Sequence, residues 1–80
     1  MKLKVKLFAT LRQYAPAEAR EGEFALDVPQ KSVTVEEVLR LCGLPEHAVT
    51  VVMVNGMVAA ANAVIEEDAE VSIFPPLAGG

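Results

Sequence analysis

The chain begins with a strict alternation of polar and apolar residues, the pattern of a β-strand with one buried face. Residues 2–8 read Lys-Leu-Lys-Val-Lys-Leu-Phe. The alternation predicts that one face of this strand packs into the core through Leu3, Val5 and Leu7. The opposite face is expected to carry the other side chains of the segment, which are Lys2, Lys4, Lys6 and Phe8.

A second strand is predicted over residues 23–28, where apolar residues again occupy every other position and Pro29 follows. Residues 9–15 are compatible with a short helical turn that stops before Pro16, because the residue ahead of a proline avoids the helical region. The rest of the connection is a charged loop. We therefore expect two neighbouring antiparallel strands joined by a long connection.

The strongest local signal is a helix start at Thr34. Thr34 followed by Glu37 forms a capping box, in which each side chain satisfies a backbone donor at the helix N-terminus. Gly43 suits the left-handed residue beyond the C-terminus, and Pro45 prevents the helix from continuing. We expect one helix of about eight to ten residues, with an apolar stripe at helical spacing formed by Val35, Val38, Leu39 and Cys42.

Three further strands are predicted in the second half of the chain. Asn55-Gly56 separates apolar runs at residues 49–54 and 57–59, which indicates a tight hairpin because both turn residues must tolerate positive φ. Residues 70–74 form the last predicted strand, whose two faces hold Val71 with Ile73 and Ser72 with Phe74. A helix that covers one face of a set of strands indicates an α+β domain.

Composition narrows the class of protein. Eighty residues, of which 52% are hydrophobic, suffice for one domain with one core and argue against disorder. The net charge of -4 argues against a nucleic-acid partner, since such binders carry a clustered basic surface. We expect a soluble cytoplasmic domain without a disulfide framework, because there is one cysteine, no signal peptide and no apolar run long enough to span a membrane.

The residues that could carry internal chemistry have simpler interpretations. Cys42 lies in the apolar stripe of the helix, where a free cysteine behaves as a small hydrophobic residue. His47 is the only histidine and has no companion ligand or nucleophile nearby in the sequence. The acidic run at residues 66–68 is expected to be solvated rather than to hold a metal. No catalytic residue, metal site or bound cofactor is therefore predicted.

The end of the sequence offers the one group with evident chemistry. We expect a domain over residues 1–74 and a flexible tail over residues 75–80, which reads Pro75, Pro76, Leu77, Ala78, Gly79 and Gly80. The two prolines cannot donate ladder hydrogen bonds, so the last strand must leave its sheet there. Gly79 and Gly80 have no Cβ and can enter slots too narrow for any side chain. The Gly80 carboxylate is the expected working group, and we expect it to be activated as a mixed anhydride with AMP.

An apolar docking surface is expected beside this carboxylate. If the first and last strands are parallel neighbours, Phe8 and Phe74 lie on the same non-core face, near the point where the tail departs. Leu77 follows three residues later. An exposed apolar patch of this kind indicates a protein–protein contact, although a loop that covers it is the alternative.

The sequence resembles the MoaD/ThiS family of sulfur carriers over essentially its whole length. The resemblance lies in residues 7–12, in the helix start at residues 34–39, in Val-Asn-Gly at residues 54–56, and most specifically in the ending Ile-Phe-Pro-Pro-Leu-Ala-Gly-Gly at residues 73–80. This ending is more similar to the MoaD branch, the small subunit of molybdopterin synthase, than to ThiS. Ala69 departs from the family, which often has glycine there, and residues 57–63 lack polar residues often seen in that segment.

The resemblance implies a β-grasp (ubiquitin-like) fold, a mixed sheet wrapped around one main helix. It implies that a MoeB-like enzyme uses ATP to adenylate Gly80, and that a persulfide donor then converts the carboxylate to a thiocarboxylate. In the MoaD branch the tail enters a MoaE-like large subunit and gives sulfur to molybdopterin, with partner contacts expected from Phe8, Phe74, Pro75, Pro76, Leu77 and Ala78. A ThiS-like carrier for thiamine or another sulfur metabolite and a ubiquitin-like modifier of lysines remain open as alternatives.

Overall fold

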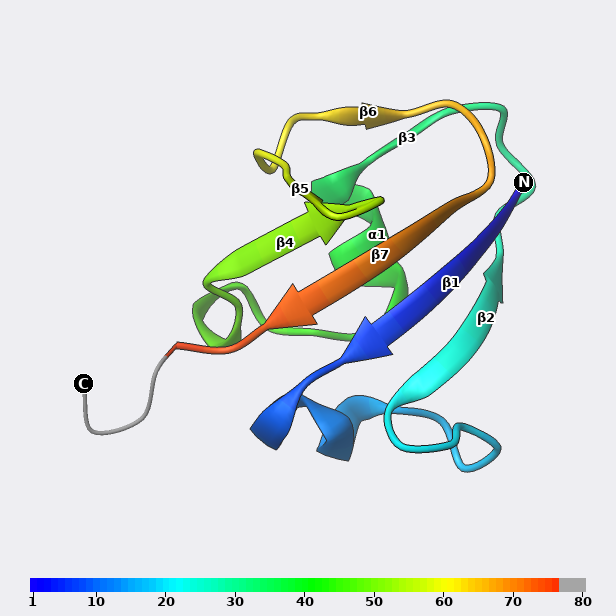
Figure 1. Cartoon of the computed structure of the whole chain (residues 1–80). Coiled ribbons are helices and arrows are strands. Elements are labelled where there is room, and N and C mark those ends of the chain that lie inside the picture. The colour runs from blue at the N-terminus through cyan, green and yellow to red at the C-terminus, as the bar shows by residue number, and fades with distance from the viewer. Residues whose placement is uncertain (77–80) are drawn as a thin grey trace.

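The first and last strands of the chain lie side by side at the centre of a five-stranded mixed sheet (Figure 1). The computed structural model describes residues 1–76. Strands β1 (Lys2–Leu7) and β7 (Ala69–Phe74) are parallel, with Leu3 opposite Ala69 and Leu7 opposite Ile73. The other strands are antiparallel to their neighbours, in the order β2-β1-β7-β4-β5, and are β2 (Glu23–Asp27), β4 (Val51–Val54) and β5 (Met57–Val58).

Within residues 1–76 one α-helix, α1 (Val35–Leu41), covers a single face of this sheet (Figure 1). The predicted alternation of strand faces is confirmed, since the core-facing side chains of β1 and β7 are almost completely buried. The helix contributes Val35 and Val38 to the same core. The buried hydrophobic residues form one cluster: Leu3, Val5, Leu7, Leu11, Val28, Val33, Val35, Val38, Leu44, Val52, Ile65, Val71 and Ile73. The α+β prediction is therefore confirmed.

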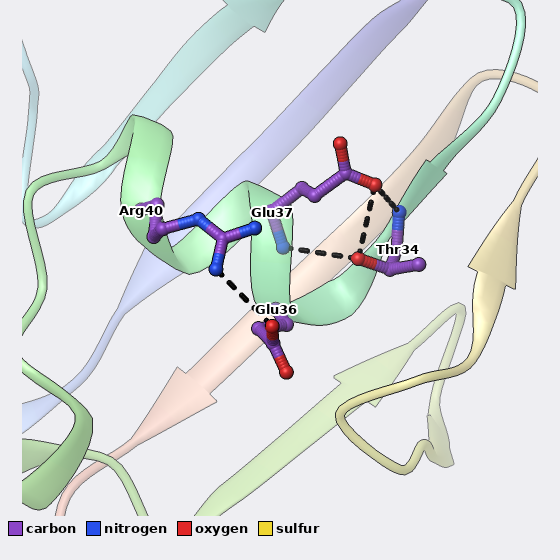
Figure 2. Close-up of polar contacts among 4 residues, drawn as sticks. All are labelled: Thr34, Glu36, Glu37 and Arg40. Atoms are coloured by element: carbon purple, nitrogen blue, oxygen red, sulfur yellow. Dashed lines mark hydrogen bonds and ion pairs between the residues drawn. The ribbon is translucent and has the colours of Figure 1, made fainter.

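The capping box at the start of α1 is also confirmed (Figure 2). The backbone N–H of Glu37 donates to Thr34 Oγ1 at 3.2 Å, and the backbone N–H of Thr34 donates to Glu37 Oε1 at 3.0 Å. These hydrogen bonds to its charged form lower the pKa of Glu37. Arg40 donates to Glu36 at 3.1 Å one turn along the exposed face of the helix, as the same view shows.

The helix is slightly shorter than predicted. It has seven residues and ends at Leu41, while Cys42 is the C-cap and Gly43 adopts φ 73. Cys42 therefore lies at the end of the apolar stripe rather than inside it, and its side chain is half-buried. The left-handed glycine ends the helix here because it turns the chain away from the helical path.

The predicted hairpin forms at Asn55-Gly56. Asn55 has φ 51 and Gly56 has φ 81, so both residues are left-handed as a two-residue turn requires. Asn55 also ties the turn to β7, because its Oδ1 accepts from the backbone N–H of Glu70 at 2.9 Å and its own N–H donates to the Glu70 carbonyl at 2.8 Å. The hairpin is thereby fixed against the central strand.

Four short elements complete the described chain. A 3-10 helix at Ala9–Tyr14 confirms the predicted turn after β1, and a second one spans Glu46–Ala48. The sequence did not predict the two-stranded sheet of β3 (Val33–Thr34) and β6 (Val64–Ile65). This small sheet lies at the top of the view in Figure 1, above the main sheet. No helix among residues 1–76 combines the length and the apolar character needed to cross a membrane.

Candidate functional site

Two phenylalanine rings stack where β1 and β7 end. Phe8 directly follows β1 and Phe74 closes β7, and their ring centroids lie 4.3 Å apart with an interplanar angle of 12°. Such a contact contributes about 0.5–1.5 kcal/mol beyond the burial of the rings. The expected contact required β1 and β7 to be parallel neighbours, and they are. This pairing brings together Phe8 and Phe74, which are 66 positions apart in the sequence. Both rings remain half-buried.

Backbone hydrogen bonds fix the positions of the two rings from both sides. The Phe8 N–H donates to the Ile73 carbonyl at 3.1 Å, and the Phe74 carbonyl accepts from the Thr50 N–H at 2.9 Å. The Phe8 carbonyl accepts from the Leu11 N–H at 3.0 Å and so begins the 3-10 helix. Because Leu11 is buried, the segment after Phe8 is anchored in the core rather than free to move away.

Gly22 permits the close approach of the chain at this end of β1. The Leu7 N–H donates to the Gly22 carbonyl at 2.9 Å, and Gly22 has φ +80. A Cβ at this glycine would lie 2.4 Å from the Leu7 carbonyl oxygen, closer than any side chain could fit. The residue immediately before Phe8 is therefore positioned by a glycine that the sequence analysis did not single out.

The stacked rings belong to a larger apolar surface on the side of the sheet away from α1. Val52 on β4 and Val71 on β7 point into the core. Because side chains alternate along a strand, the residues on either side of each of these valines point outward. Strand pairing places Val51 beside Phe74, Met53 beside Ser72, and Val58 beside Met53. We define the apolar outer face as Phe8, Val51, Met53, Val58 and Phe74. The continuous apolar run at residues 51–54 concealed this second face, because the strand is apolar on both sides.

The same side of the sheet is charged over β1 and β2. The lysines of β1 alternate with its core residues, as predicted, and face acids on both neighbouring strands. Lys6 Nζ lies 3.3 Å from Glu70 Oε1, and Lys4 Nζ lies 3.4 Å from Glu23 Oε1. These pairs are partly exposed to solvent, so each contributes little to stability. They separate a charged half of the sheet surface from the apolar outer face.

The remaining candidate contact residues lie at and beyond the end of β7. Pro75 is half-buried and Pro76 is exposed, and the strand ends before them, as the missing proline N–H requires. The tail prediction rests mainly on Leu77, Ala78, Gly79 and Gly80, which lie outside the described residues. The assignments of these four residues, and those of Phe8, Phe74, Pro75 and Pro76 as partner contacts, stay predictions.

The side chains that were considered for internal chemistry lie apart from the apolar outer face. Burial raises the pKa of the Cys42 thiol to about 11, which keeps it neutral and unreactive at physiological pH. His47 is exposed in the second 3-10 helix. Among residues 1–76 no group of three or more His, Cys, Asp or Glu side chains could hold a metal ion. Asp68, from the acidic run, has a structural contact instead, since its Oδ1 accepts from the Lys2 N–H at 2.8 Å.

The position of Ala69 in the sheet explains why alanine can replace the glycine that the family often has there. It begins β7 opposite Leu3 in regular pairing, and the positive-φ residues of the described chain do not include it. A glycine is needed where the backbone is left-handed, and the backbone of Ala69 is not. Alanine is therefore compatible with the strand at this position.

Comparisons with known proteins agree with this geometry. The model of the ThiS family matches residues 5–80. SAMP1 from Haloferax volcanii is 27% identical, with 100% of both chains covered and a TM-score of 0.73. The HVO 2177 protein of the same organism is 26% identical, with 100% of this chain and 87% of that chain covered and a TM-score of 0.72.

A further structural match supports the fold alone. A candidate molybdopterin converting factor, subunit 1, from Pyrococcus furiosus is 23% identical, with 95% of this chain and 98% of that chain covered and a TM-score of 0.72. No curated protein was found to match the sequence. The solved structures share the ubiquitin-like β-grasp arrangement of a mixed sheet and one main helix, so the predicted fold is confirmed. Because the family model covers all but the first few residues, this chain belongs to the ThiS family, within the MoaD/ThiS group of sulfur carriers that its sequence resembles.

Proposed function

We propose that this protein carries sulfur as a thiocarboxylate on Gly80 and donates it in the biosynthesis of molybdopterin. The domain itself performs no catalysis and holds no cofactor. It serves as the sulfur-donor subunit of a molybdopterin synthase-type complex with a MoaE-like large subunit. The proposed setting is the cytoplasm, where ATP and the activating enzyme are available.

The observation that carries the proposal is the match of the ThiS family model through Gly80, combined with the end of β7 at Phe74. A carrier needs its reactive group on a segment that leaves the folded domain and can enter a partner. The proline pair directly after β7 excludes further ladder pairing, which favours this role for residues 75–80. The apolar outer face beside that exit supplies the surface by which partners would recognise the carrier.

The proposed chemistry proceeds in three steps on partner enzymes. A MoeB-like enzyme directs the Gly80 carboxylate onto the α-phosphorus of ATP, which forms an acyl adenylate and releases pyrophosphate. The terminal sulfur of a persulfide then displaces AMP, and thiol reduction of the resulting acyl disulfide leaves the thiocarboxylate. The role of this chain is to present an unhindered carboxylate, since neither Gly79 nor Gly80 has a Cβ that would obstruct attack.

A ubiquitin-like modifier is the second candidate, and one observation favours it. SAMP1 matches over the full length of both chains at 27% identity, and a solved structure from the same organism is described as small archaeal modifier protein 1. A modifier uses the same activated glycine, but a lysine amine rather than a persulfide attacks it. The two functions therefore differ in the acceptor and not in the carrier.

The mass of the intact protein tests the first proposal. Incubation with the activating enzyme, ATP, magnesium, a persulfide donor and a thiol reductant should exchange one carboxylate oxygen for sulfur, with the change located at Gly80 by fragmentation. A variant that lacks Gly80 is the control and should fold normally without gaining sulfur. An unchanged mass of the full-length chain in the complete reaction would refute the proposal.

Two measurements distinguish the candidate acceptors. Molybdopterin formation with a MoaE-like subunit supports the proposed pathway, whereas sulfur transfer only with a thiazole-forming enzyme supports a ThiS-like carrier. Isopeptide-linked Gly-Gly remnants on lysines of other proteins, absent when Gly80 is deleted, would support the modifier.

A further inference from the structure

Strand β2 has a free edge on the side opposite β1. Met1 and Val28 exchange backbone hydrogen bonds of 2.7 and 2.9 Å, and Leu7 donates to Gly22. Along one strand of an antiparallel pair, residues that bond to the partner strand alternate with residues whose backbone groups point away from it. Ala25 and Asp27 are residues of the second kind, so their N–H and C=O groups point away from β1. Within residues 1–76 no protein hydrogen bond satisfies these outward groups.

The start of β2 is already covered on this edge. Arg20 and Glu23 form an isolated bridge, with hydrogen bonds of 2.9 and 3.1 Å in the two directions. The free part of the edge therefore begins at Ala25. An added strand would pair with Ala25 and Asp27. Its register would be limited by Arg20, which already pairs with Glu23 on this edge.

A groove of about 310 Å³ runs along this edge on the helix side of the sheet. The strand contributes Phe24 and Leu26, the end of α1 contributes Leu41 and Cys42, and the first 3-10 helix contributes Tyr14. Leu41 is 54% exposed, although it is a large hydrophobic residue next to other apolar side chains. Glu18 also lines the groove, so its wall is partly polar. Apolar side chains of an added strand that point to this side would pack beside Leu41 and Phe24.

The opposite face of the edge is acidic. Glu23, Ala25 and Asp27 alternate with the apolar residues of β2 and therefore share the outer face. On its paired side this strand meets the lysines of β1, of which Lys4 lies 3.4 Å from Glu23. A strand on the free side would meet the same acids, so alternating basic and apolar residues, as in β1, would complement it.

A second copy of this chain is a poor occupant of the edge. Antiparallel self-pairing that leaves Arg20 in place sets Ala25 against Asp27 of the other copy. The diagonal neighbours of each Asp27 are then the other copy's Glu23 and Asp27, which lie within reach of one another and repel. Acidic side chains on an exposed edge oppose association between identical chains in this way.

We propose that the free edge of β2 binds an extended segment of a partner protein that alternates apolar and basic residues. The segment adds a strand through the backbone groups of Ala25 and Asp27, its apolar residues enter the groove beside Leu41, and its basic residues face Glu23 and Asp27. This site is independent of Gly80, because β1 separates β2 from β7. It would persist if the sulfur-carrier proposal failed.

Titration of the ¹⁵N-labelled protein with three synthetic peptides tests the proposal. The probes are acetyl-Ser-Val-Lys-Val-Lys-Val-Ser-amide and two matched peptides in which glutamate or serine replaces both lysines. The lysine peptide should bind about three- to tenfold more tightly than the serine peptide, which should bind more tightly than the glutamate peptide. Amide shifts should centre on Ala25, Asp27 and Leu41.

Two variants separate the backbone and charge contributions. Ala25→Pro removes an outward N–H without removing a bond to β1 and should abolish binding of all three peptides. Asp27→Asn retains the edge and should reduce the preference for the lysine peptide over the glutamate peptide. If Ala25→Pro does not fold, as its amide spectrum would reveal, the Asp27→Asn comparison decides.

Three results would overturn the proposal. One is equal affinity for the lysine and glutamate peptides at low salt, and another is a set of amide shifts centred on β4 and β5. The third is a dimer of the free protein in sedimentation equilibrium that Ala25→Pro dissociates, because the edge would then be occupied by a second copy of the chain.

Discussion

Substitution of Gly22 by alanine tests how the end of β1 is positioned. An alanine at φ +80 is in a conformation that costs about 1–2 kcal/mol for an L-residue. Its Cβ would also lie 2.4 Å from the Leu7 carbonyl oxygen, so the two chain segments must separate. Separation weakens the Leu7–Gly22 hydrogen bond, whose loss costs about 0.5–1.5 kcal/mol.

Gly43→Ala is the matched control for this substitution. Gly43 has a similar φ of +73, but no atom lies within 4 Å of the position that its Cβ would occupy. Its replacement should therefore cost only the conformational term, about 1–2 kcal/mol. Gly22→Ala should cost about 1.5–3.5 kcal/mol, because the contact with Leu7 adds the loss of its hydrogen bond to the same conformational term.

Urea denaturation followed by circular dichroism measures both variants. The difference between them isolates the steric contact, since reduced freedom of the unfolded chain affects both alanines alike. For a domain of this size each kcal/mol corresponds to a shift of about 4–8 °C in Tm. Gly22→Ala should also alter the NMR shifts of the Phe8 and Phe74 rings, whereas Gly43→Ala should not. Equal stability losses in the two variants would refute the role assigned to Gly22.

The remaining predictions concern local contacts and the buried thiol. Thr34→Ala should cost about 1 kcal/mol in urea denaturation at pH 7, and a cost in the alanine variant below a few tenths of that value would contradict the capping assignment. The pKa of Glu37 is lowered in the folded state, so its carboxylate adds to stability above the unfolded pKa, and this stability is lost as the pH falls through the folded pKa. The difference in stability between wild type and Thr34→Ala should therefore shrink in acid. Asn55→Ala should cost about 1–3 kcal/mol through the lost bond to Glu70 and a left-handed alanine, while Asn55→Asp should retain most of the stability. Because the pKa of Cys42 is about 11, alkylation at pH 7.5 should be much slower in the folded protein than in urea, and comparable rates measured by mass spectrometry would contradict its burial.

The two surfaces for which we propose partners lie on different parts of the sheet. The apolar outer face lies over β7, β4 and β5, whereas the free edge belongs to β2 at the other side of β1. Between them lie the ion pairs of Lys4 and Lys6, which keep this part of the sheet polar. A partner on the edge would leave the stacked phenylalanines accessible.

Local features of the sequence determined most of the secondary structure. Alternation in β1 and β7, the capping box at Thr34 and the Asn55-Gly56 turn each act over a few residues, so their signals are complete within a short window. The fold class followed from the order of these elements. The family followed from motifs along the chain, above all from the ending through Gly80.

Tertiary structure decided what depends on contacts between distant residues. Parallel pairing of β1 with β7 stacks Phe8 on Phe74, and no local pattern specifies which strands become neighbours. The sheet of β3 and β6 was missed because two-residue strands have no periodicity to detect. Gly22 looks like an ordinary loop glycine until Leu7, fifteen positions away, comes within reach of its backbone. The sequence thus determined which elements form, whereas tertiary contacts determined which side chains share a surface, because that depends on how the chain closes over long separations.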